Sequence, residues 1–276
     1  MDGDRRNRLA ALRTDIRRLE RMAGPVRGRL SLGDPRLDSA LPGGGLSLGQ
    51  WHEIGGEGAE AETGAAPAAF AARLAAALLA RPDQRGRSAV WILRRDDLFP
   101  PGLAGLGLPA ERLVGVCARD EAEALGVAED ALASPGVGVV LAEVGAVDLT
   151  AGRRLQLACE ARGGTGLVIL RRPFGGGGAT AGGTAAATCW RVAPAASAPN
   201  LGGLGLVGLG LGGLGLGPPR WRLRLARSRG GRSGAWLVEA AGTADEGEAD
   251  VAHPLRLVAE LGDRDLAAPA AFSAAG

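Results

Sequence analysis

Short apolar runs alternate with helical patterns along the central part of the chain. The runs occupy residues 50–54, 88–93, 111–118, 136–144 and 165–172, and the helical patterns occupy residues 67–80, 120–134 and 150–163. Runs that are apolar at nearly every position are typical of strands buried on both faces of a sheet. The repeated strand-helix order therefore predicts an α/β fold with a mostly parallel central sheet flanked by helices.

Local signals mark the ends of the predicted helices. Pro67 suits the first turn of the helix over 67–80, where its missing N–H leaves no partner unsatisfied. Thr150 is a predicted N-cap for the helix over 150–163, because its hydroxyl can accept a hydrogen bond from an amide of the first turn. A further short helix is expected over 35–41, ahead of the first apolar strand.

The pattern changes after residue 173. Residues 220–225 alternate arginine with tryptophan or leucine, which is the period-two pattern of a half-exposed strand. Gly230 and Gly231 predict a tight turn, and residues 236–238 the returning strand, so we expect a C-terminal β-hairpin. The Gly/Leu tract over 201–217 is apolar, but glycine is a poor helix former, so we expect a low-complexity insertion and no membrane span.

The N-terminal residues have the pattern of an amphipathic helix over 5–22. Leu9, Leu12, Ile16 and Leu19 share one stripe, and arginines surround it. Such a helix either packs back on the domain or docks on a partner. The chain is thus expected to have three parts: a basic N-terminal helix over 1–30, an α/β domain over 31–240 and an acidic, partly flexible tail over 241–276.

Charge is distributed unevenly along the 276 residues. All 32 basic residues are arginine, because the chain contains no lysine. Residues 4–36 hold ten arginines against four acids, residues 218–238 hold six arginines and no acid, and residues 239–265 hold eight acids and two arginines. The two basic segments are candidate contact surfaces.

The cysteines and the N-terminus indicate the compartment. Cys117, Cys159 and Cys189 have neither a Cys-x-x-Cys spacing nor a nearby histidine, so no metal site is expected and a reducing compartment fits. The arginine-rich N-terminus lacks the apolar stretch of a secretory signal. We therefore expect a cytoplasmic protein.

Residues 52–70 have the outline of a phosphate-binding loop: a strand, a glycine-rich bend and an apolar helix. A working loop needs a lysine to neutralise the phosphates and a hydroxyl to hold magnesium. Here Gly64 is followed by Ala65 and Ala66, and glutamates in the bend would repel a triphosphate. We expect a vestigial loop that takes no nucleotide cofactor and no metal, and therefore no ATP hydrolysis.

Glu143 lies near the end of the buried run 136–144, where a magnesium-directing acid would be placed. A carboxylate at the end of an interior parallel strand faces the crevice with or without a ligand. Without the cation of the loop, we interpret Glu143 as vestigial. The two histidines, His52 and His253, support no catalytic dyad, and His52 is expected to be a buried, hydrogen-bonded ring. No catalytic residue is predicted.

The predicted hairpin carries the second group of candidate contacts. Arg227, Arg229 and Arg232 lie near its turn, and Trp236 lies on its returning strand. Such residues suit phosphate contacts, base stacking or protein docking. The alternative is a solvated strand edge that its charges keep from aggregating.

Several motifs together resemble the RecA recombinase family and, within it, the ImuA family, the RecA-like and SulA-related component of the bacterial ImuA/ImuB mutagenesis cassette. These motifs are "LPGGGL" followed by "HEI", then "RRLQLA", "AAATCWRV" and "PRWRLRLARSRGGRSGAWLVE". The resemblance spans about residues 31 to 240, the size of an ordinary domain.

The resemblance implies a RecA-like fold and a non-catalytic accessory role in SOS-induced, error-prone translesion DNA synthesis. The implied partners are ImuB, an error-prone DNA polymerase complex and RecA. By position, Arg227 and Arg229 match paired basic residues that in recombinases reach the nucleotide of a neighbouring subunit. Residues 174–183 match a DNA-binding loop, but they carry no charge here, which leaves direct DNA contact open.

Three functions follow as hypotheses. The first is a protein-interaction module that docks partners through the N-terminal helix and the arginine hairpin. The second is an active RecA-like ATPase that binds DNA or remodels RecA filaments, with an arginine such as Arg227 in place of lysine. The third is a SulA-like inhibitor of cell division, which would require neither a degenerate nucleotide site nor basic surfaces.

Overall fold

The structure is a computed structural model, and it describes residues 28–57, 64–171, 184–197, 199–200, 215–241 and 253–262. Three predicted features lie outside these ranges: the leucine stripe of the N-terminal helix, the loop 174–183, and the Gly/Leu tract up to residue 214. Among the described residues, no helix is both long and apolar enough to cross a membrane.

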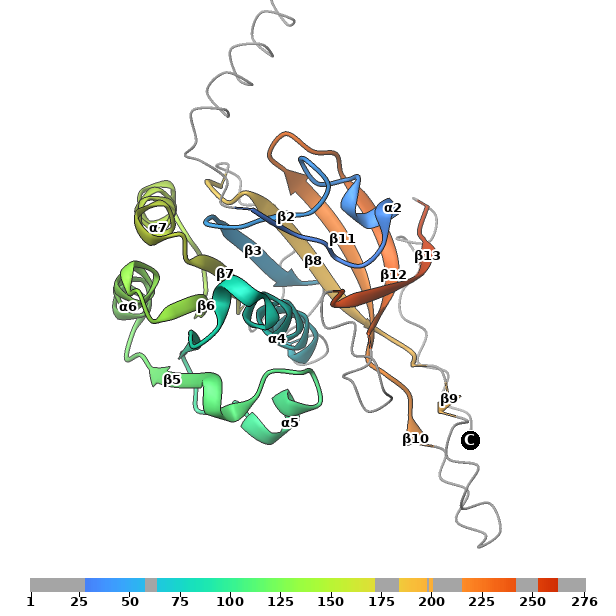
Figure 1. Ribbon diagram of the computed structural model, residues 1–276, viewed down its shortest axis with the longest axis horizontal. Helices are drawn as coiled ribbons and strands as arrows, with labels where there is room; N and C mark the ends of the chain where they lie inside the picture. The colour runs from blue at the N-terminus through green and yellow to red at the C-terminus, as the bar shows by residue number, and fades with distance from the viewer. Residues whose placement is uncertain are drawn as a thin grey trace, which may run out of the picture.

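A nine-stranded mixed sheet forms the centre of the molecule (Figure 1). Its order is β13-β12-β11-β8-β3-β7-β6-β4-β5. The six strands from β8 to β5 are parallel to one another, and β11, β12 and β13 continue the sheet antiparallel to their neighbours. The strands are β3 (Trp51–Gly56), β4 (Ser88–Leu93), β5 (Leu113–Cys117), β6 (Val137–Val144), β7 (Thr165–Leu170), β8 (Thr188–Ala195), β11 (Arg220–Ser228), β12 (Gly234–Ala240) and β13 (Leu255–Glu260). The predicted mostly parallel sheet is confirmed.

Helices cover both faces of the parallel half of the sheet, as expected. On one face α4 (Ala65–Ala80) packs its Phe70 and Leu74 against the strands. On the other face α6 (Glu121–Ala133) and α7 (Leu149–Arg162) lie side by side (Figure 1). Each face has its own buried apolar cluster, so the sheet separates two cores.

Smaller elements complete the described part of the fold. One two-stranded ribbon pairs β1 with β2, and a second pairs β9 with β10. The leucines of the segment that carries β1, α2 and β2 join the same core as α4. The bounds are β1 (Arg29–Leu30), α2 (Pro35–Asp38), β2 (Leu46–Ser47), η1 (Pro82–Gln84), α5 (Pro100–Ala104), η2 (Ala110–Arg112), β9 (Pro199–Asn200) and β10 (Gly215–Leu216).

Aspartates cap the two helices of the second face. The Asp120 carboxylate accepts a hydrogen bond from the amide of Glu123 at 2.8 Å and begins α6. The Asp148 carboxylate accepts one from the amide of Ala151 at 2.7 Å and begins α7. The prediction of Thr150 as the N-cap of this helix was wrong, because the helix begins one residue earlier and aspartate is a better cap than threonine.

The antiparallel strands owe their place to alternating side chains. Trp221, Leu223 and Leu225 of β11 are buried and face the core that contains α4. The ring of Trp221 lies 6.1 Å from that of Phe70 in an edge-on arrangement that aromatic pairs favour. The arginines between them point to the opposite face, so β11 has one apolar and one polar side.

The sheet extends past residue 240, into the segment that we assigned to the acidic tail. Strand β13 pairs with β12, and its Leu255 is buried in the core. Arg73 of α4, itself buried, donates a hydrogen bond to the carbonyl of Pro254 at 2.9 Å. The predicted domain boundary at residue 240 therefore falls inside the sheet.

Candidate functional site

The predicted vestigial loop joins β3 to α4, and its described part offers neither a cation nor a hydroxyl. Gly64 precedes the helix and makes no side-chain cap. Ala65 and Ala66 form the first positions of α4, and Pro67 follows them without an N–H. The helix end presents backbone amides alone, which is less than the phosphate loop of a nucleotide-binding protein supplies.

Glu143 is fully buried near the end of β6, and both of its carboxylate oxygens are bonded to other side chains. The indole N–H of Trp91 donates to Oε1 at 3.0 Å. Arg171 donates from Nε to Oε2 at 3.1 Å and from Nη2 to Oε1 at 3.0 Å. This paired geometry is the strongest that arginine makes with a carboxylate. The guanidinium thus neutralises the acid that we predicted at the metal-directing position.

Arg171 also connects Glu143 to the loop after β4. Its Nη2 lies 3.5 Å from Oδ1 of Asp97, and Nε of Arg95 lies 3.4 Å from Oδ2 of the same aspartate. We call these four residues, Arg95, Asp97, Glu143 and Arg171, the ionic cluster. Its two cations and two carboxylates cancel in charge.

Arg171 was not among the predicted site residues, although its position relative to Glu143 could have indicated it. In the parallel pair β6 and β7, Glu143 lies opposite Ile169. Arg171 follows two residues later, so it emerges at the same edge of the sheet as Glu143. An acid and a base that leave neighbouring parallel strands at one edge are candidates for an ion pair.

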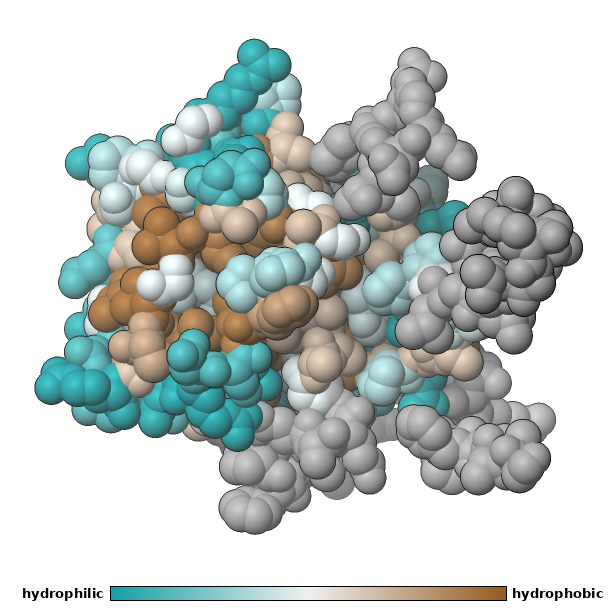
Figure 2. Space-filling model, turned by 90° about the horizontal axis from the view of Figure 1, so that it is seen from below, coloured by the Kyte–Doolittle hydropathy of each residue, from teal (hydrophilic) through white to brown (hydrophobic). Residues whose placement is uncertain are grey.

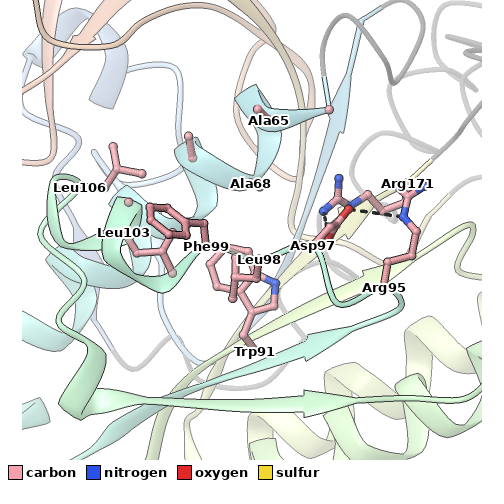
Figure 3. Close-up of a pocket in the computed structure, with 13 residues that line it drawn as sticks. Ala65, Ala68, Trp91, Arg95, Asp97, Leu98, Phe99, Leu103, Leu106 and Arg171 are labelled. Atoms are coloured by element: carbon pink, nitrogen blue, oxygen red, sulfur yellow. Dashed lines mark hydrogen bonds and ion pairs between the residues drawn. The ribbon is translucent and has the colours of Figure 1, made fainter.

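A cavity of about 560 Å³ lies beside the ionic cluster (Figure 3). Leu98, Phe99, Leu103 and Leu106 gather at one end of it, and Ala68 of α4 forms part of a wall (Figure 3). The other end is lined by Arg95, Asp97 and Arg171 of the ionic cluster. We call this cavity the apolar pocket. The underside of the molecule, where α5 and β5 lie in Figure 1, shows apolar surface between hydrophilic margins in Figure 2.

Among the described residues at this edge of the sheet, the structure shows no metal centre. Within the described ranges, no three histidine, cysteine or acidic side chains gather as a metal site would require. Cys159 and Cys189 are buried, and burial raises the pKa of the Cys159 thiol to about 12, so this thiol stays protonated. Glu143 is buried at this edge, and its oxygens are already bonded.

The three arginines near the hairpin turn contact their own chain. Arg227 donates from Nη2 to the carbonyls of Thr184 and, at 2.7 Å, Ala186. Arg229 donates to the carbonyl of Ala185, between the two. These two arginines therefore hold the start of the segment that leads into β8. An arginine carries five N–H donors, so both retain capacity for further contacts.

Arg232 and Trp236 differ in exposure. Arg232 is exposed and donates to the hydroxyl of Ser39 at 3.0 Å. Trp236 is 3% exposed and packs against the ring of Trp190 at 6.4 Å. Its prediction as a partner contact is corrected: it lies on the apolar side of β12, opposite Leu223 of β11, and so belongs to the core.

The fold and site define a mixed α/β protein whose parallel strands end beside a buried carboxylate that is paired with an arginine of the same chain. The chain belongs to the ImuA family. It is 52% identical over 243 residues to Protein ImuA of Caulobacter vibrioides, from strain NA1000 / CB15N and equally from strain ATCC 19089 / CIP 103742 / CB 15. The match covers 87% of this chain and 92% of each relative.

Two further comparisons add little. No protein-family model matches the chain. Among solved structures, the crystal structure of SulA from Pseudomonas aeruginosa covers 44% of this chain and 96% of that chain, at 22% identity and a TM-score of 0.37. A similarity this low bears on neither fold nor function.

Proposed function

We propose that this chain is a non-catalytic accessory component of damage-induced, error-prone translesion DNA synthesis. It acts as a RecA-like interaction module that binds ImuB within the error-prone polymerase complex, with RecA as a second partner. Membership of the ImuA family supports a place in the mutagenesis cassette. The parallel sheet with helices on both faces is consistent with a RecA-like core.

The observation that carries the non-catalytic part is the state of Glu143. Magnesium would have to displace Arg171 from both carboxylate oxygens, and it would break the pairing of that partly buried guanidinium with Glu143. No lysine of this chain can neutralise the phosphates, because the sequence has none. Phosphoryl transfer depends on positioning and on such cations, so the site lacks what that chemistry requires.

ATP turnover is the first test. We expect the purified protein to hydrolyse no more ATP than its Glu143→Gln variant, with or without single-stranded DNA. In the wild type Arg171 holds the Glu143 carboxylate, and in the variant that carboxylate is gone, so neither protein offers it to magnesium. Calorimetric titration with Mg-ATP is expected to show no binding heat. DNA-stimulated turnover that the Glu143→Gln variant loses would contradict the proposal and favour an ATPase.

The second test concerns partner contact. We expect ImuB to capture the chain less well when residues 1–24 are removed or when Arg232 is changed to alanine, by about tenfold if either is an energetic anchor. Arg232→Ala is a cleaner change than Arg227→Ala or Arg229→Ala, because those two also hold residues 184–186.

The matched control is Arg119→Ala. The side chain of Arg119 is 84% exposed and pairs with Glu123 on α6, away from the hairpin turn. Its loss is expected to leave capture of ImuB unchanged. Equal weakening by Arg119→Ala and Arg232→Ala would show a nonspecific charge effect and would remove the hairpin turn from the proposed contact surface. Repeating the series with RecA tests the second partner.

A further inference from the structure

The apolar pocket has the shape of a binding site but the wrong chemistry for a nucleotide. Its volume of about 560 Å³ lies within the range of ordinary ligand pockets, roughly 300–1,000 Å³. Alanines of α4 form one wall, and leucines in and around α5 form another. A phosphate placed here would meet a carboxylate, Asp97, and two arginines that are already paired.

The charged side chains at the end of the pocket are paired with one another and so favour an uncharged ligand. Arg171 is bonded to Glu143 and lies close to Asp97, and Arg95 pairs with the same aspartate. Because the ionic cluster sums to zero, an anionic or cationic ligand gains no net attraction from it. An uncharged apolar ligand can fill the rest of the pocket without breaking any of these pairs.

Phe99 stands at the opening of the pocket and is 70% exposed. Two prolines, Pro100 and Pro101, follow it and begin α5, so the backbone around the ring is restricted. An exposed aromatic side chain on a restricted backbone, at the edge of an apolar cavity, is suited to act as an energetic anchor in a protein interface. Figure 2 shows apolar surface on this side of the molecule.

We propose that the apolar pocket binds a bulky, uncharged side chain, leucine or phenylalanine, of a partner protein, with Phe99 packing against it. The position beside the start of α4, where a phosphate-loop protein would hold its nucleotide, is thus a docking site for a protein segment. This inference rests on the proposed function, since it assigns a contact surface to the interaction module. It is distinct from the basic surface at the hairpin turn.

Two pocket variants test the assignment, with full-length ImuB as the probe in a quantitative capture assay. Ala68→Phe fills the pocket from α4, and Phe99→Ala removes the aromatic ring at its opening. Each is expected to weaken capture about tenfold or more. Leu157→Ala is the matched control, because Leu157 is an exposed apolar residue of α7 on the other side of the sheet. It is expected to leave capture unchanged.

The outcomes separate this inference from the proposed function. If ImuB does not capture the wild-type chain, both are overturned. If it captures the wild type and all variants equally, the pocket assignment fails and the proposed function stands. An equal loss with Leu157→Ala, a change of oligomeric mass in the pocket variants alone, or displacement of ImuB by Mg-ATP would also overturn the assignment. Should Ala68→Phe fail to fold, Phe99→Ala decides, because that side chain is largely exposed.

Discussion

The Arg191→Ala variant is expected to lose about 3–5 kcal/mol of the free energy of unfolding, because it leaves the charge of Glu53 buried without a partner. Nη1 and Nη2 of Arg191 each lie 3.0 Å from Oε1 of Glu53. The side chains are 8% and 2% exposed, respectively, so water cannot replace the lost contact. Urea unfolding followed by tryptophan fluorescence measures the difference.

The pair Arg224 and Glu57 provides the matched control for this prediction. Whereas Arg191 joins β8 to β3, this pair joins β11 to the residue that follows β3, with Nε 2.6 Å from Oε1, and its side chains are 40% and 30% exposed. Removal of an exposed partner costs about 1 kcal/mol or less, because solvent screens the remaining charge. Similar losses for Arg224→Ala and Arg191→Ala would show that burial is not the cause.

A double variant separates the worth of the pair from the penalty of breaking it. In Glu53→Gln with Arg191→Met, neither position of the pair carries a charge, so most of the loss seen in Arg191→Ala should be recovered.

Gly55 of β3 lies next to the guanidinium of Arg191. A Cβ on Gly55 would lie 3.0 Å from Nη1 of Arg191, so a larger residue at this position of β3 would require the guanidinium to shift by a few tenths of an ångström.

The parallel half of the fold could be predicted from the sequence because its signals are local. Strand β4 spans 88–93 as expected, α6 is one residue shorter than predicted at each end, and β6 begins one residue later than predicted. Runs of apolar residues bounded by turns identify buried strands without knowledge of the neighbouring strands.

The two strands that were not predicted, β8 and β13, depend on contacts that are distant in sequence. Strand β8 contains Arg191, and the sequence alone does not show that a glutamate 138 residues away would neutralise it within the sheet. Strand β13 lies beyond an acidic segment, and its position depends on Arg73 of α4. Neither strand was among the predicted elements, and the acidic composition placed residues 255–260 in a partly flexible tail.

For the candidate site, the sequence indicated the positions but not their partners. Glu143 lies at the end of β6 as expected, whereas Arg171 and the apolar pocket depend on the packing of three separate segments. Trp236 was misplaced for a related reason. Period-two alternation shows which residues of a strand share a face, but not which face the rest of the chain covers.

His52 is a neutral, buried ring whose two nitrogens are both satisfied. Nε2 lies 2.8 Å from the carbonyl of Ser47 and donates its hydrogen to it. Nδ1 lies 2.8 Å from the hydroxyl of Thr188 and accepts its hydrogen. The lone pairs of the same hydroxyl remain available, and one of them accepts from the indole of Trp190 at 2.9 Å. A second proton on the ring would break this arrangement. Burial, aided by the positive charge of Arg229, lowers the pKa of His52 from 6.5 to about 4.

Stability should therefore fall between pH 7 and pH 5 by about 2 kcal/mol through His52 alone. The pKa of His52 is lower in the folded state than in the unfolded state. Below pH 6.5 the unfolded chain therefore binds a proton at this ring, whereas the folded chain binds it only when the pH approaches 4. The contribution is complete above pH 6.5 and decreases as the pH falls. Urea unfolding at both pH values tests this in the wild type and in His52→Gln, which should lack this part of the decline. His253→Gln, which changes the other histidine, should retain it, and an equal decline in the His52→Gln variant would refute the assignment.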